Sequence, residues 1–277
     1  MKLGIVIAYY QELQTIDAVL DAFKHIEVPF NVYLIEDCSP KPVQPILDKW
    51  GDKPWFKYLP NEVNKGCAFG FNRGVKAALA DGCEFIAIND SDDIAYANKF
   101  KLQLALLEND PELMLVGGAA DMVDQDTDEL LWRCYHPTTN DVIHRQHRLN
   151  STFVHSTVVY RASLFEDVGF YKEDAYMPDY ELLTRILHKG HKAANVPEVV
   201  MRYNIRQDSQ SVSRPARLIR SRMATQVRYF DPLNIWCYIG LARSCLAYMM
   251  PGKSVTRLKA WFYKLNPCSS PANKKPA

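Results

Sequence analysis

The residues of this chain best suited to chemistry are five consecutive polar residues, Asn89-Asp90-Ser91-Asp92-Asp93. They follow an apolar, strand-like run, residues 84–88, and precede a stretch with helical periodicity that begins at about Ala95. Three carboxylates within four positions repel one another unless a cation lies between them. Mg²⁺ and Mn²⁺ prefer oxygen ligands and are often held by one or two carboxylates together with substrate phosphates. An acidic helix start is the alternative reading, because Asp stabilises helix N-termini.

Three other polar segments could take part in the same chemistry. Asp37 ends an apolar run and could accept the imide N–H of a pyrimidine base, although Asp also favours ordinary turns. Gly66, two residues after Asn64, directly precedes a predicted helix. The free backbone N–H groups at the start of that helix would favour phosphates. Neither a Walker A loop nor a GxGxxG fingerprint is present. Asp179 opens a predicted helix, where it could act as a general base or simply cap the helix.

The elements that must position these residues follow an alternating pattern in the first 120 residues. Strands alternating with amphipathic helices predict a mostly parallel α/β sheet, in which ligands bind beyond the carboxyl ends of the strands. The predicted strands are 3–8, 31–35, 56–59, 85–88 and 113–116, and the predicted helices are 15–25, 68–80 and 98–108. Residues 9–12, 36–39 and 90–93 all fall at strand ends. We therefore expect these three polar clusters to share one site.

The alternation loosens beyond residue 120. Residues 130–135, 153–160 and 199–203 are predicted strands, and residues 139–148 and 178–188 are predicted helices. After Arg214 the pattern is helical, with an apolar stretch at 232–250 that is short for a membrane span. The last ten residues, rich in Pro, Ser and Lys, have the composition of a disordered tail.

Composition and charge narrow the class of protein. The chain has 277 residues, of which 48% are hydrophobic and 23% charged, as in ordinary globular proteins. Its seven cysteines form no CxxC pair, and no signal peptide is evident, so we expect free thiols in a reducing cytosol. The net charge of +1 hides an asymmetry, because the segment from Arg214 onward carries twelve basic residues and one acid, Asp231. Such a segment favours an anionic partner, either a membrane leaflet or a nucleic acid.

The order of these motifs resembles the family 2 glycosyltransferases, which have the GT-A fold. The resemblance covers roughly residues 3–205, and each piece is weak although the combination is specific. The matching segments, in order, are Ile5-Val6-Ile7-Ala8-Tyr9-Tyr10-Gln11-Glu12, Glu36-Asp37-Cys38-Ser39, Asn64-Lys65-Gly66 with Ala68 and Asn72, Asp90-Ser91-Asp92-Asp93, and Asp179-Tyr180-Glu181-Leu182. The chain departs from the family pattern at Tyr10-Gln11, at Glu36 and at Pro178, so Asp174 and Glu181 compete with Asp179 for the role of base.

The resemblance implies roles for individual residues. Asp37 would bind uracil, Asp90 and Asp92 would form the DxD motif on the metal and diphosphate, and Asp179 would be the base of an inverting transfer. The residues expected to bind the nucleotide-sugar are Ala8, Tyr10, Glu12, Asp37, Asn64, Gly66, Asn72, Asp90 and Ser91. The residues expected on the acceptor side are His155, Tyr180 and Glu181. The Gln-x-x-Arg-Trp signature of processive synthases is absent, which favours addition of a single sugar.

These observations predict an α/β protein of the GT-A type, with a mixed, mostly parallel sheet and a C-terminal helical appendage. The expected regions are a catalytic domain at 1–213, divided at about 120 into nucleotide-sugar and acceptor halves, a basic helical region at 214–266, and a tail at 267–277. The expected activity is transfer of one sugar from a nucleotide-sugar, with UDP preferred, to a hydroxyl of a glycan or lipid-linked acceptor, as in surface polysaccharide or lipopolysaccharide assembly.

The expected cofactor is Mn²⁺ or Mg²⁺. The expected location is the cytoplasm, where the basic C-terminal region could dock on the inner face of the cytoplasmic membrane. Three alternatives remain. A sugar nucleotidyltransferase would need a glycine-rich loop after the first strand, and residues 8–12 contain no glycine. A nucleic-acid-binding protein would leave the acidic cluster unexplained. A noncatalytic nucleotide-sugar-binding relative is the third.

Overall fold

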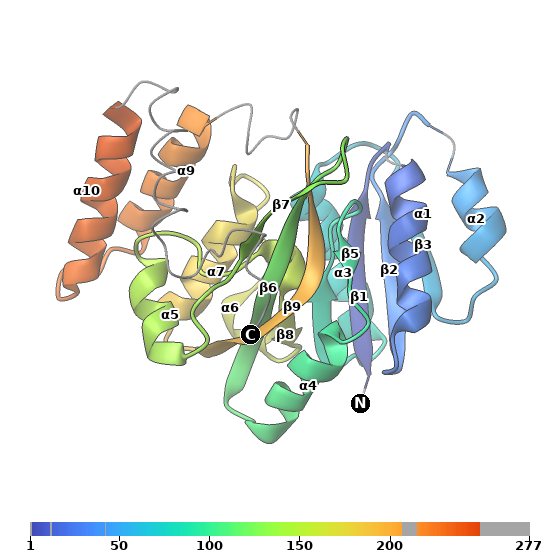
Figure 1. Cartoon of the computed structure of the whole chain (residues 1–277), viewed down its shortest axis with the longest axis horizontal. Helices are drawn as coiled ribbons and strands as arrows, with labels where there is room; N and C mark the ends of the chain where they lie inside the picture. The colour runs from blue at the N-terminus through green and yellow to red at the C-terminus, as the bar shows by residue number, and fades with distance from the viewer. Residues whose placement is uncertain (1, 12, 42, 207–214, 250–277) are drawn as a thin grey trace.

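The computed structural model describes residues 2–11, 13–41, 43–206 and 215–249. Within them, nine strands form one sheet, in the order β3-β2-β1-β4-β8-β6-β9-β5, with β7 paired to β6 (Figure 1). The strands are β1 (Leu3–Tyr9), β2 (Phe30–Glu36), β3 (Phe56–Pro60), β4 (Phe85–Ile88), β5 (Ile94–Ala95), β6 (Leu113–Asp124), β7 (Leu130–Cys134), β8 (Val159–Arg161) and β9 (Lys192–Ile205).

Helices cover both faces of the sheet. They are α1 (Leu13–Ala22), η1 (Phe23–His25), α2 (Gln44–Trp50), α3 (Cys67–Ala80), α4 (Lys99–Asn109), α5 (Asn140–His147), η2 (His155–Thr157), α6 (Leu164–Val168), α7 (Pro178–His188), α9 (Pro215–Arg228) and α10 (Ile235–Met249). One apolar layer packs α1, α2 and α4 against the sheet, and the other packs α3, α6 and α7 against it. The central strands are buried on both sides, which explains their nearly continuous apolar sequences.

The first four strands set the location of the site. β1 pairs in parallel with β2 on one side and with β4 on the other, so the strand order reverses at β1. In open α/β sheets, a crevice forms at the carboxyl ends of the strands flanking such a reversal. Helix α3 lies close against these strands, because a Cβ at Gly74 would come within 2.3 Å of Val6 and 2.5 Å of Ile35. The predicted convergence of three strand ends is therefore a property of this topology.

Several predicted elements differ from the observed ones. The predicted strand at 153–160 is instead the short helix η2 followed by β8. The stretch from Ala95 does not begin a helix, because Ile94 and Ala95 pair antiparallel with β9, and α4 starts only at Lys99. Strands β6 and β9 extend beyond their predicted ends because they pair with each other in parallel along most of their length. All of these differences depend on strand partners distant in sequence.

The C-terminal helices α9 and α10 pack against each other and lie beside α5 and α7 (Figure 1). Gly240 of α10 approaches the carbonyl oxygen of Arg148 so closely that a Cβ there would lie 2.0 Å away. Among the described residues, no helix is long and apolar enough to cross a membrane. The predicted boundary at 213–214, the helical pattern after residue 250 and the tail at 267–277 lie outside the described residues.

Candidate active site at the carboxyl ends of the central strands

The loops that leave β1, β2 and β4 are joined to one another by backbone hydrogen bonds. The Asp37 N–H donates to the Tyr9 carbonyl (2.9 Å), and the Asn89 N–H donates to the Val6 carbonyl (3.0 Å). Two non-glycine residues directly after these strands have positive φ angles, Gln11 at 66° and Cys38 at 54°. Such conformations persist where the surrounding structure holds them, and they are common at functional sites.

Asp37 organises the loop that precedes α3. Its nearly buried carboxylate accepts bonds from the backbone N–H groups of Lys65 (2.9 Å) and Gly66 (2.7 Å) and from the Asn61 side chain (2.8 Å). The Asn64 amide donates to the Asp37 carbonyl (3.1 Å). Gly66 has a φ of 86°, and the space where its side chain would lie is open. The loop thus presents its backbone to the crevice, as a close approach by a ligand would require.

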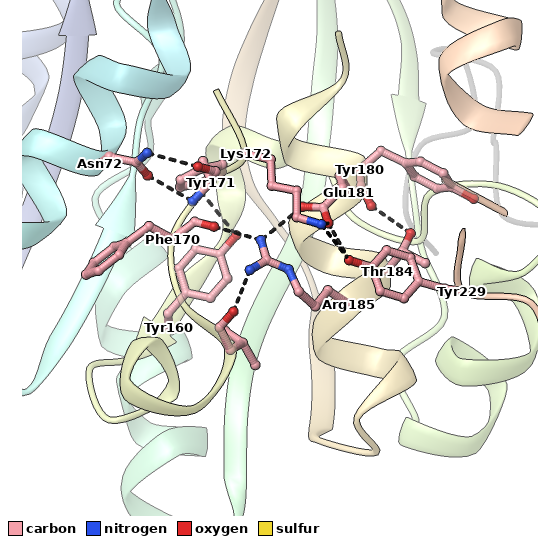
Figure 2. Close-up of polar contacts among 11 residues, drawn as sticks. Asn72, Tyr160, Phe170, Tyr171, Lys172, Tyr180, Glu181, Thr184, Arg185 and Tyr229 are labelled. Carbon is pink, nitrogen blue, oxygen red and sulfur yellow. Dashed lines mark hydrogen bonds and ion pairs between the residues drawn. The ribbon is translucent and has the colours of Figure 1, made fainter. Parts of the chain in front are cut away.

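The other residues predicted on the nucleotide side have different surroundings. Ala8 is partly exposed at the end of β1, Tyr10 is 43% exposed, and Ser91 is buried within the loop after β4. Glu12 lies outside the described residues. Asn72 is buried, and its side-chain amide is used within the protein (Figure 2). It accepts a bond from the Tyr171 N–H (2.8 Å) and donates to the Tyr171 carbonyl (2.9 Å) and to Glu173 (3.0 Å). The geometry therefore gives Asn72 a structural role between α3 and residues 171–173.

The acidic cluster after β4 divides into an outer and an inner part. The side chains of Asp90 and Asp92 are 32% and 21% exposed, whereas Asp93 is buried. The Ser156 hydroxyl lies 2.7 Å from Asp90 Oδ2 and also contacts Asp93 Oδ2. Because this hydroxyl has one proton, it can donate fully to only one of the two carboxylates at a time. The third carboxylate therefore lies in the interior, whereas the other two are partly accessible.

The pKa values of the cluster show a shortage of positive charge. Burial and the charge of Asp90 raise the pKa of Asp92 to about 7, and burial with both neighbouring carboxylates raises that of Asp93 well above its usual range. Despite burial, the neighbouring His155 and the Ser156 hydroxyl lower the pKa of Asp90. The nearest described cation to the Asp92 carboxylate is Arg206, whose Nη1 is 3.9 Å from Oδ2. A cation at the outer pair would relieve this repulsion.

Two buried residues that sequence reasoning missed support the acidic cluster after β4 from inside the protein. Lys99 is fully buried, donates to the Ser156 carbonyl (2.6 Å), and has a pKa lowered by burial to about 7. Asn204, at the end of β9, donates its backbone N–H to Asp93 Oδ1 (2.9 Å), and its side chain bonds to the Asp92 carbonyl. Lys99 was visible as a charge in the first turn of a predicted helix, but no local pattern marked Asn204.

The donor set fits a small divalent cation that shares its coordination with phosphate oxygens. Two carboxylates on one edge of the crevice match the one or two carboxylates typical of Mg²⁺ sites. Within the described ranges, no group of three His, Cys, Asp or Glu side chains could hold a metal by itself. Asp90 and Asp92 would therefore hold Mn²⁺ or Mg²⁺ only together with a ligand. The assignment of Asp90 and Asp92 as metal ligands stays a prediction.

His155 connects the cluster to the segment that leads into α7. Its Nδ1 lies 3.8 Å from Asp90 Oδ1, and its Nε2 lies 3.0 Å from the hydroxyl of Tyr171. Although burial opposes protonation, the nearby Asp90 and Asp179 raise the pKa of His155. Its partner Tyr171 was not predicted from the sequence, because its role depends on contacts with residues far away in the chain.

Asp179 lies in the first turn of α7, and it is partly exposed. Among the described residues, none forms a hydrogen bond with its carboxylate. Its charge and that of Asp90 contribute, after burial, to raising the pKa of the Cys67 thiol to about 11, so both carboxylates lie near the start of α3. Asp174 is exposed. A carboxylate that is accessible and without a described partner is suited to accept a proton.

The two residues after Asp179 do not face an acceptor. Tyr180 is 1% exposed and stacks on His147 with ring centroids 5.2 Å apart. Glu181 is also 1% exposed, and its carboxylate contacts Lys172, Arg185 and Tyr229. These contacts of both side chains lie within the protein. The structure therefore gives both residues a supporting role and removes Glu181 from the competition for the base.

Comparison with known proteins identifies the family. Residues 4–169 match the family model described as glycosyl transferase family 2. The chain belongs to this family. The amylovoran biosynthesis glycosyltransferase AmsE of Erwinia amylovora is 30% identical over 178 residues, which are 64% of this chain and 65% of AmsE. The putative glycosyltransferase EpsE of Bacillus subtilis is 26% identical over 212 residues, which are 73% of this chain and 71% of EpsE. The chain thus matches just under two thirds of the length of AmsE.

Solved structures show that this family 2 chain has the GT-A fold. The S. aureus TarS fragment 1-349 in complex with UDP-GlcNAc superposes with a TM-score of 0.69 at 16% identity, covering 96% of this chain and 82% of the fragment. The mannosyltransferase PcManGT from Pyrobaculum calidifontis, in complex with GDP-Man and Mn²⁺, gives a TM-score of 0.64 at 17% identity, covering 95% of this chain and 79% of PcManGT. The predicted fold class is confirmed.

Proposed function

We propose that this protein is an inverting glycosyltransferase that moves one sugar from a UDP-sugar to a hydroxyl of a glycan or lipid-linked acceptor in surface polysaccharide assembly. The observation that carries the proposal is the pair of partly exposed carboxylates, Asp90 and Asp92, at the end of β4, where burial and the charge of Asp90 raise the pKa of Asp92 to about 7. The name of AmsE refers to amylovoran biosynthesis, and TarS was solved with UDP-GlcNAc, which supports this substrate class.

On the donor side, the chain would bind the nucleotide through the loops after β1, β2 and β4. The backbone at Gly66 and the N-terminus of α3 favour negative charge. Asp90 and Asp92 would hold Mn²⁺ or Mg²⁺, which supplies Lewis-acid stabilisation of the leaving diphosphate. Asp37 keeps the loop at 64–66 in place and is the residue proposed to select uracil.

On the acceptor side, Asp179 would accept the proton of the attacking hydroxyl. Sugar transfer passes through an oxocarbenium-like transition state, so the hydroxyl becomes acidic as its bond to the anomeric carbon forms. When the base lies on the face opposite the leaving group, the hydroxyl attacks from that face, and the configuration at the anomeric carbon inverts. Asp179 extends from α7, whereas Asp90 and Asp92 follow β4, so base and metal ligands belong to different parts of the fold.

The proposal can be tested with nucleotide-sugars directly. UDP- and GDP-sugars are screened by thermal shift with Mn²⁺, because a ligand that binds only the native state raises its stability. Release of UDP is then measured with and without glycan and lipid-linked acceptors. We expect stabilisation by a UDP-sugar, and UDP release that depends on acceptor and stops with EDTA. Stabilisation without release would indicate a noncatalytic binding protein, and stabilisation by GDP-sugars alone would overturn the choice of uracil.

We also propose that the C-terminal helices dock on an anionic membrane leaflet, where a lipid-linked acceptor would be found. The support is that the segment 215–249 exposes both apolar and basic side chains, the composition of interfacial helices. The apolar members are Leu233 (96% exposed), Ile235 (63%), Leu246 (62%) and Met249 (79%), and the basic members are the exposed Arg217, Arg220, Arg228 and Arg243.

Co-sedimentation with liposomes tests this docking. Binding to phosphatidylglycerol vesicles should be clear at low salt and should fall with added salt, because each basic residue at the surface contributes about 1 kcal/mol. A variant with Arg217, Arg220 and Arg228 changed to Gln should bind more weakly. Equal pelleting with neutral vesicles, or none with anionic vesicles, would overturn the proposal.

A further inference from the structure

A buried cluster joins the start of α7 to the C-terminal helix α9 (Figure 2). At its centre is Glu181, whose side chain is 1% exposed. Arg185 Nη2 donates to Glu181 Oε2 (2.9 Å), Lys172 Nζ lies 3.1 Å from Oε1, and the Tyr229 hydroxyl donates to Oε1. The carboxylate thus has two cations and one neutral donor, and the neutral donor is the residue directly after α9.

The cluster also fixes the segment between α6 and α7. Arg185 donates to the carbonyls of Val168 and Phe170, the latter at 2.7 Å. The next residue, Tyr171, is held by Asn72 of α3 through two bonds of its backbone, and its hydroxyl meets His155 beside Asp90. One continuous set of contacts therefore runs from α9, through α7 and the segment at 168–172, to the metal-binding side.

Two buried side chains hold the first turn of α7: Tyr180, which stacks on His147, and Glu181. The N-cap residue of this helix, Met177, makes no side-chain capping bond, and Pro178 occupies the first helical position. Helix starts without a capping side chain depend on other contacts for their position. Here the contacts of Glu181, two residues after Asp179 in the same turn, supply part of that anchorage.

We propose that Tyr229 is a positioning residue for sugar transfer, which fixes the first turn of α7, and with it Asp179, through its hydroxyl bond to Glu181. On this view the C-terminal helices complete the acceptor half of the site instead of forming a separate appendage. The inference rests on the proposed function in that it takes Asp179 as the base. It predicts that Tyr229 affects transfer while leaving donor binding intact.

The test compares Tyr229→Phe with Tyr238→Phe. Each variant loses one tyrosine hydroxyl from the C-terminal helices, but Tyr238 donates only to the carbonyl of Pro232 (3.2 Å) at an exposed position. We expect Tyr229→Phe to lower kcat for transfer by about 10- to 100-fold, because small misplacements of a catalytic group are costly. The KM for the UDP-sugar and the Kd for UDP with Mn²⁺ should stay within about twofold of wild type, and Tyr238→Phe should match wild type throughout.

Hydrogen exchange gives a second readout that needs no activity. Amides of residues 170–182 should exchange roughly 10-fold faster in Tyr229→Phe than in Tyr238→Phe, the size expected for one lost bond to a charged group. Equal exchange and equal kcat in the two variants would overturn the inference. A parallel loss of UDP affinity and kcat would also overturn it, since that pattern indicates general destabilisation. Full transfer by Asp179→Asn would remove the proposed base, while the exchange data would still decide whether Tyr229 holds α7.

Discussion

Two groups of carboxylates in this protein have opposite surroundings. The cluster after β4 places Asp90, Asp92 and Asp93 together. Burial and the charge of Asp90 raise the pKa of Asp92, and burial with both neighbouring carboxylates raises that of Asp93. Glu181 is 1% exposed, and Lys172 and Arg185 supply two positive charges and Tyr229 a third donor. In the first group the carboxylates repel one another and are only partly compensated by His155, Lys99 and Arg206, whereas in the second two cations accompany one carboxylate.

The difference teaches how to separate a binding site from a structural ion pair. A carboxylate with paired cations can remain ionised inside the protein and fix the elements around it. Carboxylates without such partners destabilise the empty protein and gain most from an added cation. Asp179 is a third case, because it is partly exposed and has no hydrogen-bond partner among the described residues, which leaves it available for proton transfer.

The largest effect is expected for Asp179. Asp179→Asn should keep donor binding but lower transfer by roughly 10²–10⁴-fold, the usual contribution of a positioned general base. The assay is UDP release in the presence of acceptor, with UDP affinity measured by calorimetry. Asp174→Asn serves as the control, since Asp174 is an exposed carboxylate five residues earlier. Near-normal transfer by Asp179→Asn, with a loss in the control, would move the role to Asp174.

Next in size is the effect at Asp92. Asp92→Asn should lower turnover by about 100-fold or more, since metal stabilisation of the leaving group contributes several kcal/mol. The same change should leave thermal stability in EDTA unchanged or higher, because burial and the charge of Asp90 disfavour the charged form of Asp92. Calorimetry with UDP should show that Mn²⁺ strengthens binding to wild type and to the exposed-loop control Asp126→Asn, but not to Asp92→Asn. Equal UDP affinity with Mn²⁺, with EDTA and in Asp92→Asn would show that the metal assignment is wrong.

The third expected effect, at Glu181, is on stability. Glu181→Gln leaves the charges of Lys172 and Arg185 without a counter-charge, so the free energy of unfolding should fall by about 3 kcal/mol. Its control is Asp167→Asn, whose partner Lys189 is 2.7 Å away in an exposed ion pair, and which should cost less than about 1 kcal/mol. Urea unfolding measures both. Similar losses in the two variants would contradict the distinction between compensated and exposed carboxylates.

Much of the nucleotide side could be predicted from the sequence. The apolar runs that became β1, β2 and β4, and the polar residues directly after them, are local patterns, and parallel pairing brings their ends to one edge. The acceptor side was harder to predict. Tyr180 and Glu181 stand next to Asp179 in the chain, but a helix turns successive side chains by about 100°, and only Asp179 faces outward.

The sequence by itself determined the family, the fold class and the acidic residues at the strand ends, because each rests on short-range periodicity or on residue types at adjacent positions. Only the tertiary structure decided which of those residues are compensated. Asn204 and Tyr229 bond to the two carboxylate groups from positions distant in sequence, and no local pattern specifies such contacts. Whether a buried carboxylate binds a cation or holds a helix depends on these long-range partners, since charge compensation is set by distance in space.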